Sequence, residues 1–136
     1  MREILFRGKT TLDNEWVVGA GVYKSEGYTW IITDDATKTE NRGTGSDAIN
    51  PETIGQYTGL TDKNGTKIFE GDIVKGLFCY CLPVNSIVTF RDGAFGLLWY
   101  RGDIETFWAF TSICNVEYEV IGNIHDNPEL MVGEQQ

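Results

Sequence analysis

The chain has 136 residues, of which 41% are hydrophobic and 12% aromatic, so it is long enough to bury the core of one globular domain without disulfides or metals. Its 20 acidic residues outnumber 11 basic ones and give a net charge of -9, which disfavours nucleic acid and anionic lipid as partners. No apolar run approaches the length of about 20 residues that a membrane span requires.

Short apolar runs separated by Gly, Asn and Asp predict a mainly β fold, because they lack the spacing of a long helix. The runs richest in β-branched and aromatic residues mark the expected strands. In chain order these are residues 4–6, 16–23, 28–33, 72–79, 87–90, 95–100 and 116–121. Gly19 and Gly21 fall inside the second run and lack the third glycine of a dinucleotide-binding turn, so they predict a twisted or bulged strand.

Polar residues dominate positions 34–56, where Ile49 and Ile54 are the large apolar side chains. This composition predicts a polar loop or linker, either a separator between subdomains or a mobile arm. The chain then divides into an N-terminal β segment at 1–33, the linker at 34–56 and a C-terminal region at 57–136. Near the end, Asn127-Pro128-Glu129 predicts a short helical turn.

Three reversals stand out within the C-terminal region. Asp92-Gly93 lies between two apolar runs and predicts a hairpin. Residues 62–65 and 70–72 form two more turns, the second leading directly into Ile73-Val74-Lys75. A turn followed by a Gly-Asp-Ile-Val-Lys strand is common at the start of SH3-like barrels. By analogy we expect a small antiparallel, SH3-like β-barrel from about Gly65 to Ile124.

Three blocks of the sequence carry a resemblance to a known family. Residues 56–75 read QYTGLTDKNGTKIFEGDIVK, residues 118–130 read YEVIGNIHDNPEL, and the start reads REILFRGK followed by Trp16 and Gly19. In this order they resemble the YopX family, a group of small proteins encoded by bacteriophages and prophages. The resemblance covers nearly the whole chain. It implies a phage or prophage origin, a mainly β fold and action inside the bacterial cell, without an established activity, cofactor or catalytic residue.

The central block has a direct physical interpretation. Its glycines permit turns, and Asp62 and Asp72 can accept hydrogen bonds from neighbouring backbone N–H groups. Its apolar residues are expected to fill a core: Ile68, Phe69, Ile73 and Val74. The glycines expected in the turns are Gly59, Gly65 and Gly71. The block is therefore predicted to have a structural role in turns and core rather than a catalytic one.

The cysteines and the single histidine supply the reactive side chains of this sequence. Cys79, Cys81, Cys114 and His125 would reach the four ligands of a zinc site, but a flat strand does not wrap a metal as zinc-binding turns do. We therefore expect free thiols of a reducing cytoplasm, with no metal and no cofactor.

Two catalytic arrangements are also open to the sequence. Cys114, His125 and Asp126 could supply the nucleophile, the base and the orienting acid of a catalytic triad. However, His125 and Asp126 are adjacent, and adjacent side chains on a strand point to opposite faces. Glu117 and Glu119 could share a strand face, although alternating acids there are typical of a solvated outer face. We expect no catalytic residues. An enzyme using carboxylates would need a pocket that encloses two acids with separated pKa values.

Trp99, Arg101 and Trp108 are the candidate binding residues, because they lie among other aromatic residues within a short segment. They could form a stacking platform for bases or for a partner's side chains, or the aromatic rings could belong to the core. The acidic residues of positions 115–136 could attract a basic partner or remain solvated.

These observations favour a non-catalytic β module that acts in the bacterial cytoplasm by contact with itself, as a homo-oligomer, or with a host or phage protein. The alternative is a nucleic-acid-associated accessory protein of phage replication or regulation that uses Trp99, Arg101 and Trp108. The charge of the chain makes nucleic acid the less favoured partner. No membrane partner is expected.

Overall fold

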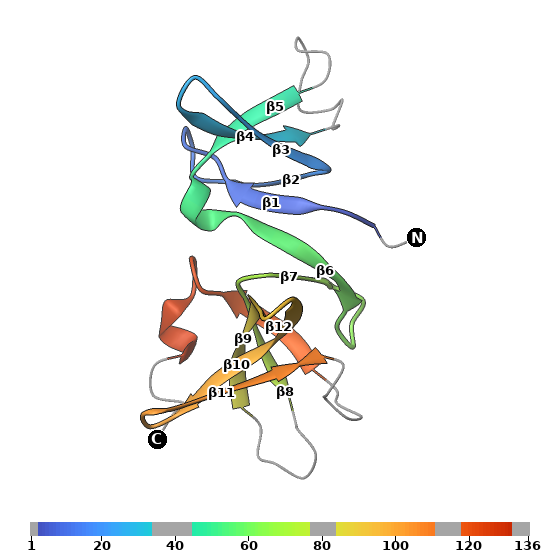
Figure 1. Ribbon diagram of the computed structural model, residues 1–136, viewed down its shortest axis with the longest axis vertical. Helices are drawn as coiled ribbons and strands as arrows, with labels where there is room; N and C mark the ends of the chain where they lie inside the picture. The colour runs from blue at the N-terminus through green and yellow to red at the C-terminus, as the bar shows by residue number, and fades with distance from the viewer. Residues whose placement is uncertain (1–2, 34–44, 77–83, 111–117, 132–136) are drawn as a thin grey trace. The chain divides into compact units, whose positions relative to one another are not determined.

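The computed structural model describes residues 3–33, 45–76, 84–110 and 118–131, with only the backbone of Val84 and Arg101 (Figure 1). The prediction of a mainly β protein is confirmed, because antiparallel sheets make up most of these residues. The chain forms two compact units, at residues 1–57 and 58–136. The helices among the described residues are short single turns, and none has the length or apolar character to cross a lipid bilayer.

The N-terminal unit consists of two small sheets that share a core. In one sheet β1 pairs with β2 and with the start of β6, and in the other β4 lies between β3 and β5. Val17, Ile31 and Ile49 are buried together between the sheets. The elements are β1 (Phe6–Lys9), β2 (Trp16–Gly19), β3 (Gly21–Ser25), β4 (Tyr28–Thr33), β5 (Gly45–Ile49), the 3₁₀ helix η1 (Pro51–Thr53) and β6 (Gly55–Thr61).

The chain leaves one sheet and enters the other at Ala20, where a single bulged strand was predicted for residues 16–23. Close packing explains the glycine at the crossing. A Cβ atom on Gly19 would lie 1.9 Å from the backbone oxygen of Ile32. Gly19 therefore lets the backbone of β2 pass directly against β4.

The segment predicted as a loop at 34–56 contains β5 and η1, and its residues 34–44 lie outside the described part of the chain. The sequence of β5, Gly-Ser-Asp-Ala-Ile, has weak strand propensity. Backbone pairing with β4 and burial of Ile49 therefore hold this strand in place. Asn50 caps η1, because its side-chain oxygen accepts the N–H of Glu52 at 3.2 Å.

The C-terminal unit contains a five-stranded antiparallel sheet in the order β11-β10-β9-β8-β12. The SH3-like barrel expected from about Gly65 to Ile124 is not formed by the described residues: the sheet is open, because β11 and β12 lie at its two ends and do not pair with each other. Ile68, Val74, Val88 and Leu97 form its buried core. The elements, after the end of β6, are β7 (Lys67–Phe69), β8 (Asp72–Gly76), β9 (Val84–Arg91), β10 (Ala94–Arg101), β11 (Ile104–Ala109), β12 (Tyr118–Asn123) and η3 (Pro128–Met131).

Two local predictions in this unit are confirmed. Asp92 and Gly93 both have positive φ angles, of 53° and 82°, and they join β9 to β10 in a two-residue hairpin. The helical turn expected after Asn127 is present as η3.

The Asp62 carboxylate connects the turn after β6 to the distant strand β12. Its Oδ1 atom accepts the N–H groups of Asn64 at 2.8 Å and Thr66 at 2.9 Å, while Oδ2 accepts the N–H of Val120 at 2.9 Å. Burial of the side chain raises the pKa of Asp62, but these donors and the Lys63 charge outweigh burial and lower the pKa below its ordinary value. The side chain is therefore held as a carboxylate.

Asp72 has a similar local role, because its Oδ2 atom accepts the N–H of Phe69 at 2.8 Å. Gly65 and Gly71 have positive φ angles, as their positions in turns require. Gly59 was also expected in a turn, but it lies within strand β6, where its φ angle is 89°. The apolar residues expected in the core, Ile68, Phe69, Ile73 and Val74, are buried. The structural interpretation of residues 56–75 is thus confirmed except at Gly59.

We expect Gly19→Ala to destabilise the protein by about 2–3 kcal/mol, because its Cβ would collide with the main chain of β4 and force the sheets apart. Urea unfolding of the full chain measures this change. Gly21→Ala is the matched control, since its Cβ would meet the flexible Cδ1 atom of Ile32 at 3.1 Å. Equal losses of stability for the two variants would contradict the assigned role of Gly19.

We expect Asp62→Asn to cost about 2 kcal/mol at pH 7, because an amide cannot accept from three N–H groups as a carboxylate does. Since the folded state lowers the pKa of Asp62, its contribution is complete above the unfolded pKa of about 4 and is lost as pH falls through the folded pKa.

Urea unfolding at a series of pH values tests this expectation. The stability difference between wild type and Asp62→Asn should shrink below about pH 4. Asp92→Asn is the control, because Asp92 is exposed in a hairpin turn that also accommodates Asn. A difference that stays constant down to pH 2, about two units below the unfolded pKa, would refute a carboxylate-specific role.

Candidate binding surface of the N-terminal unit

Two of the predicted binding residues, Trp99 and Trp108, meet on neighbouring strands of the C-terminal unit. Their rings pack edge to face with centroids 5.4 Å apart, and both pack against the core cluster that contains Leu97. Much of the surface of both rings therefore contacts other residues of the C-terminal unit. The third residue, Arg101, ends β10, and its side chain lies outside the described part of the structure.

The cysteine-based hypotheses fall on Cys79, Cys81 and Cys114, which lie outside the described residues, as does Glu117. The backbone N–H of His125 donates to the side-chain oxygen of Asn123 at 3.0 Å within a tight turn. Within the described ranges, no group of at least three His, Cys, Asp or Glu residues is arranged to hold a metal ion.

Glu119 was considered as one of a pair of catalytic carboxylates. It instead faces Lys63, with 3.6 Å between the carboxylate oxygen and Nζ. Both side chains are nearly half exposed, so this ion pair contributes little stability. Its position beside the turn at residues 62–65 is consistent with an outer strand face.

An exposed group of aromatic rings covers the outer face of the β3–β4 hairpin. Glu26 and Gly27 have φ angles of 53° and 83° and form the two-residue turn, which pairs Tyr23 with Trp30 across the strands. The rings of Tyr23 and Trp30 stack with centroids 6.2 Å apart and an interplanar angle of 10°. Tyr28 meets Trp30 edge to face, also at 6.2 Å.

Ile32 belongs to the same face, because it lies two residues beyond Trp30 on β4. Exposure is 56% for Tyr28, 40% for Tyr23 and 37% for Ile32. We name these three residues and Trp30 the aromatic face. The alternation Tyr28-x-Trp30-x-Ile32 was a sequence signal for this surface, but it does not distinguish an exposed strand face from a buried one.

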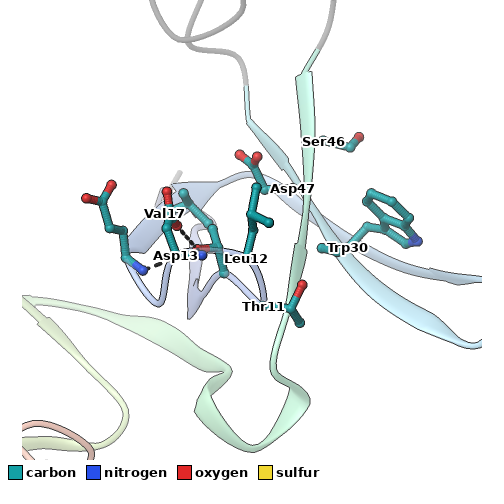
Figure 2. Close-up of a pocket in the computed structure, with 10 residues that line it drawn as sticks. Thr11, Leu12, Asp13, Val17, Trp30, Ser46 and Asp47 are labelled. Atoms are coloured by element: carbon teal, nitrogen blue, oxygen red, sulfur yellow. Dashed lines mark hydrogen bonds between the residues drawn. The ribbon is translucent and has the colours of Figure 1, made fainter.

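A pocket of about 440 Å³ lies beside the aromatic face, where β5 forms the edge of its sheet (Figure 2). It is lined by residues 10–13, Glu15, Val17, Trp30 and residues 46–48. The loop between β1 and β2 forms one wall. Thr10 organises this loop, because its N–H donates to the oxygen of Glu15 at 2.9 Å and its hydroxyl accepts the Glu15 N–H at 3.2 Å.

The described residues that line the pocket carry one sign of charge. Asp13, Glu15 and Asp47 contribute carboxylates, and no Lys or Arg is among these described lining residues. Leu12 projects from the loop and is 92% exposed. Exposed carboxylates next to apolar side chains suit the binding of a cationic, partly apolar group. Sequence analysis missed this site, because the carboxylates come from two separate segments and β5 was assigned to a loop.

The family comparison adds to this geometry. The model of the YopX protein family matches residues 5–132, which includes both compact units. No curated protein matches the chain. A match over nearly all of the 136 residues establishes membership: the chain belongs to the YopX family.

Proposed function

We propose that this protein is a non-catalytic interaction module of phage or prophage origin that acts in the bacterial cytoplasm. It works by protein–protein contact through the aromatic face, and self-association is part of this role. The observation that carries the proposal is the cluster of Tyr23, Tyr28 and Trp30 on an exposed sheet surface. Tyrosine and tryptophan are enriched at the energetic centres of protein interfaces.

Two physical features support the aromatic face as a contact surface. Trp30 is held in place by its stacking on Tyr23 and by donation of its Nε1–H to the Ser25 oxygen at 3.3 Å. Rings held in this way lose little side-chain entropy on binding. Ile32 extends the face with aliphatic surface, and contiguous exposed apolar surface of this kind is typical of interaction sites.

The nucleic-acid alternative has weaker support. The net charge of -9 opposes approach to a phosphate backbone. The two tryptophans expected to stack on bases pack against each other and against the core of the C-terminal unit. We therefore rank nucleic-acid binding below protein contact.

Light scattering coupled to size-exclusion chromatography tests the proposal. At about 50 micromolar we expect the wild-type protein to elute as an oligomer, because exposed tyrosine and tryptophan are enriched among the residues that dominate binding energy at interfaces. Tyr28→Glu places a charge in the aromatic face and is expected to yield the monomer. Far-ultraviolet circular dichroism verifies that the variant retains its strands.

Ile104→Glu is the matched control. Ile104 is 66% exposed on β11 of the C-terminal unit, so it offers an exposed apolar residue outside the aromatic face. The oligomer should persist in this variant. A wild-type monomer at that concentration, or loss of the oligomer in Ile104→Glu and not in Tyr28→Glu, would sink self-association through the aromatic face.

A further inference from the structure

The edge of β5 has main-chain groups directed away from its sheet. Thr11 donates its N–H to the oxygen of Ala48 at 3.0 Å, so the Ala48 carbonyl points away from β4. The main-chain N–H and C=O groups of an antiparallel strand point to the same side at every second residue. The main-chain groups of Ser46 therefore also point away from β4. Within the described ranges, β5 is the last strand on this side of its sheet.

The pocket lies along this same edge. The β1–β2 loop begins to pair with β5 at the bridge between Thr10 and Ile49, and the main-chain bond from Thr11 to Ala48 extends this contact. Ser46 and Asp47 line the pocket beyond that point. An extended peptide entering the pocket could continue the pairing along β5.

The two sides of the edge differ in chemistry. Asp47 pairs with Ile31 and lies on the core-facing side of the sheet, whereas Ser46 and Ala48 share the opposite side with Trp30. Figure 2 shows Asp13 and Asp47 on one side of β5 and Trp30 and Ser46 on the other. An added strand would present alternate side chains to a carboxylate side and to an aromatic side.

We propose that the β5 edge and its pocket bind an extended segment of a partner protein in which Lys or Arg alternates with apolar residues, added to the sheet as a further strand. Basic side chains reach the carboxylates of Asp13, Glu15 and Asp47, and apolar side chains contact Trp30. The charge of the lining selects a basic occupant. This inference rests on the proposed function, since it names one partner of a protein that works by contact.

Titration of the full-length, isotope-labelled protein, followed by amide chemical shifts, tests the proposal. The probe is an acetylated and amidated hexapeptide of alternating Lys and Val. One matched peptide replaces each Lys by Glu, and another carries N-methyl groups on alternate backbone nitrogens. We expect the Lys peptide to shift the Ser46 and Ala48 amides, and each matched peptide to bind at least about tenfold more weakly.

Variants of the protein examine the charge contribution. Asp47→Asn and Asp13→Asn should each weaken binding of the Lys peptide by about three- to fivefold, with smaller effects in high salt. Asp92→Asn is the matched control, because it removes a carboxylate from the C-terminal unit and should leave the affinity unchanged. Ile104→Glu, which lies in the C-terminal unit and does not line the pocket, should bind the peptide with unchanged affinity.

Three results would overturn the inference. These are equal binding of the Glu and Lys peptides, indifference to N-methylation, and unchanged affinity in Asp47→Asn. A Ser46 amide that shifts with protein concentration in the absence of peptide would assign the edge to a second copy of the chain, and would also overturn it. If Tyr28→Glu yields a monomer but no Lys peptide binds, the β5 inference alone fails and the proposed function stands.

Discussion

The Asp62 carboxylate satisfies main-chain donors from two distant parts of the C-terminal unit. Two of its acceptor bonds close the turn after β6, and the third reaches Val120 on β12, 58 residues away. The turn is also tied to β12 by the Lys63 N–H, which donates to the Tyr118 oxygen at 3.1 Å. A buried carboxylate is stable here because backbone N–H groups replace the water that it loses. In addition to its ladder with β8, the strand β12 is therefore held by a charge that belongs to a turn.

Much of the C-terminal unit could be predicted from sequence, because its local signals agree with one another. Asp92-Gly93 predicted a hairpin, and Gly65 and Gly71 predicted turns in which both adopt positive φ angles. The strand β11 (Ile104–Ala109) was missed, because its residues show no alternation of exposed and buried side chains, and pairing with β10 holds it in the sheet. The barrel was expected by analogy from the turn and strand at residues 70–75, which do not indicate whether the first and last strands of the sheet pair with each other.

The N-terminal unit was harder to predict because tertiary packing overrides local preference there. Strand β5 contains Gly, Ser and Asp, and its place follows from pairing with β4 and from one buried residue, Ile49. Without β5, neither the pocket nor the edge beside Trp30 could be inferred from sequence. Trp99 and Trp108 were predicted as parts of a binding platform, but composition could not decide how much of each ring belongs to the core.

The span of the Asp62–Val120 bond has a consequence for synthesis of the protein on the ribosome. Residues 1–57 contain the pairing of β1 with β2 and with the start of β6, and of β4 with β3 and β5, so these ladders can form as soon as that segment emerges. The third bond of Asp62 must wait until Val120 has left the exit tunnel, which at about 5–20 residues per second takes several seconds. During this interval the nascent C-terminal unit has an incomplete sheet, so chaperone dependence is expected to concentrate in that half of the chain.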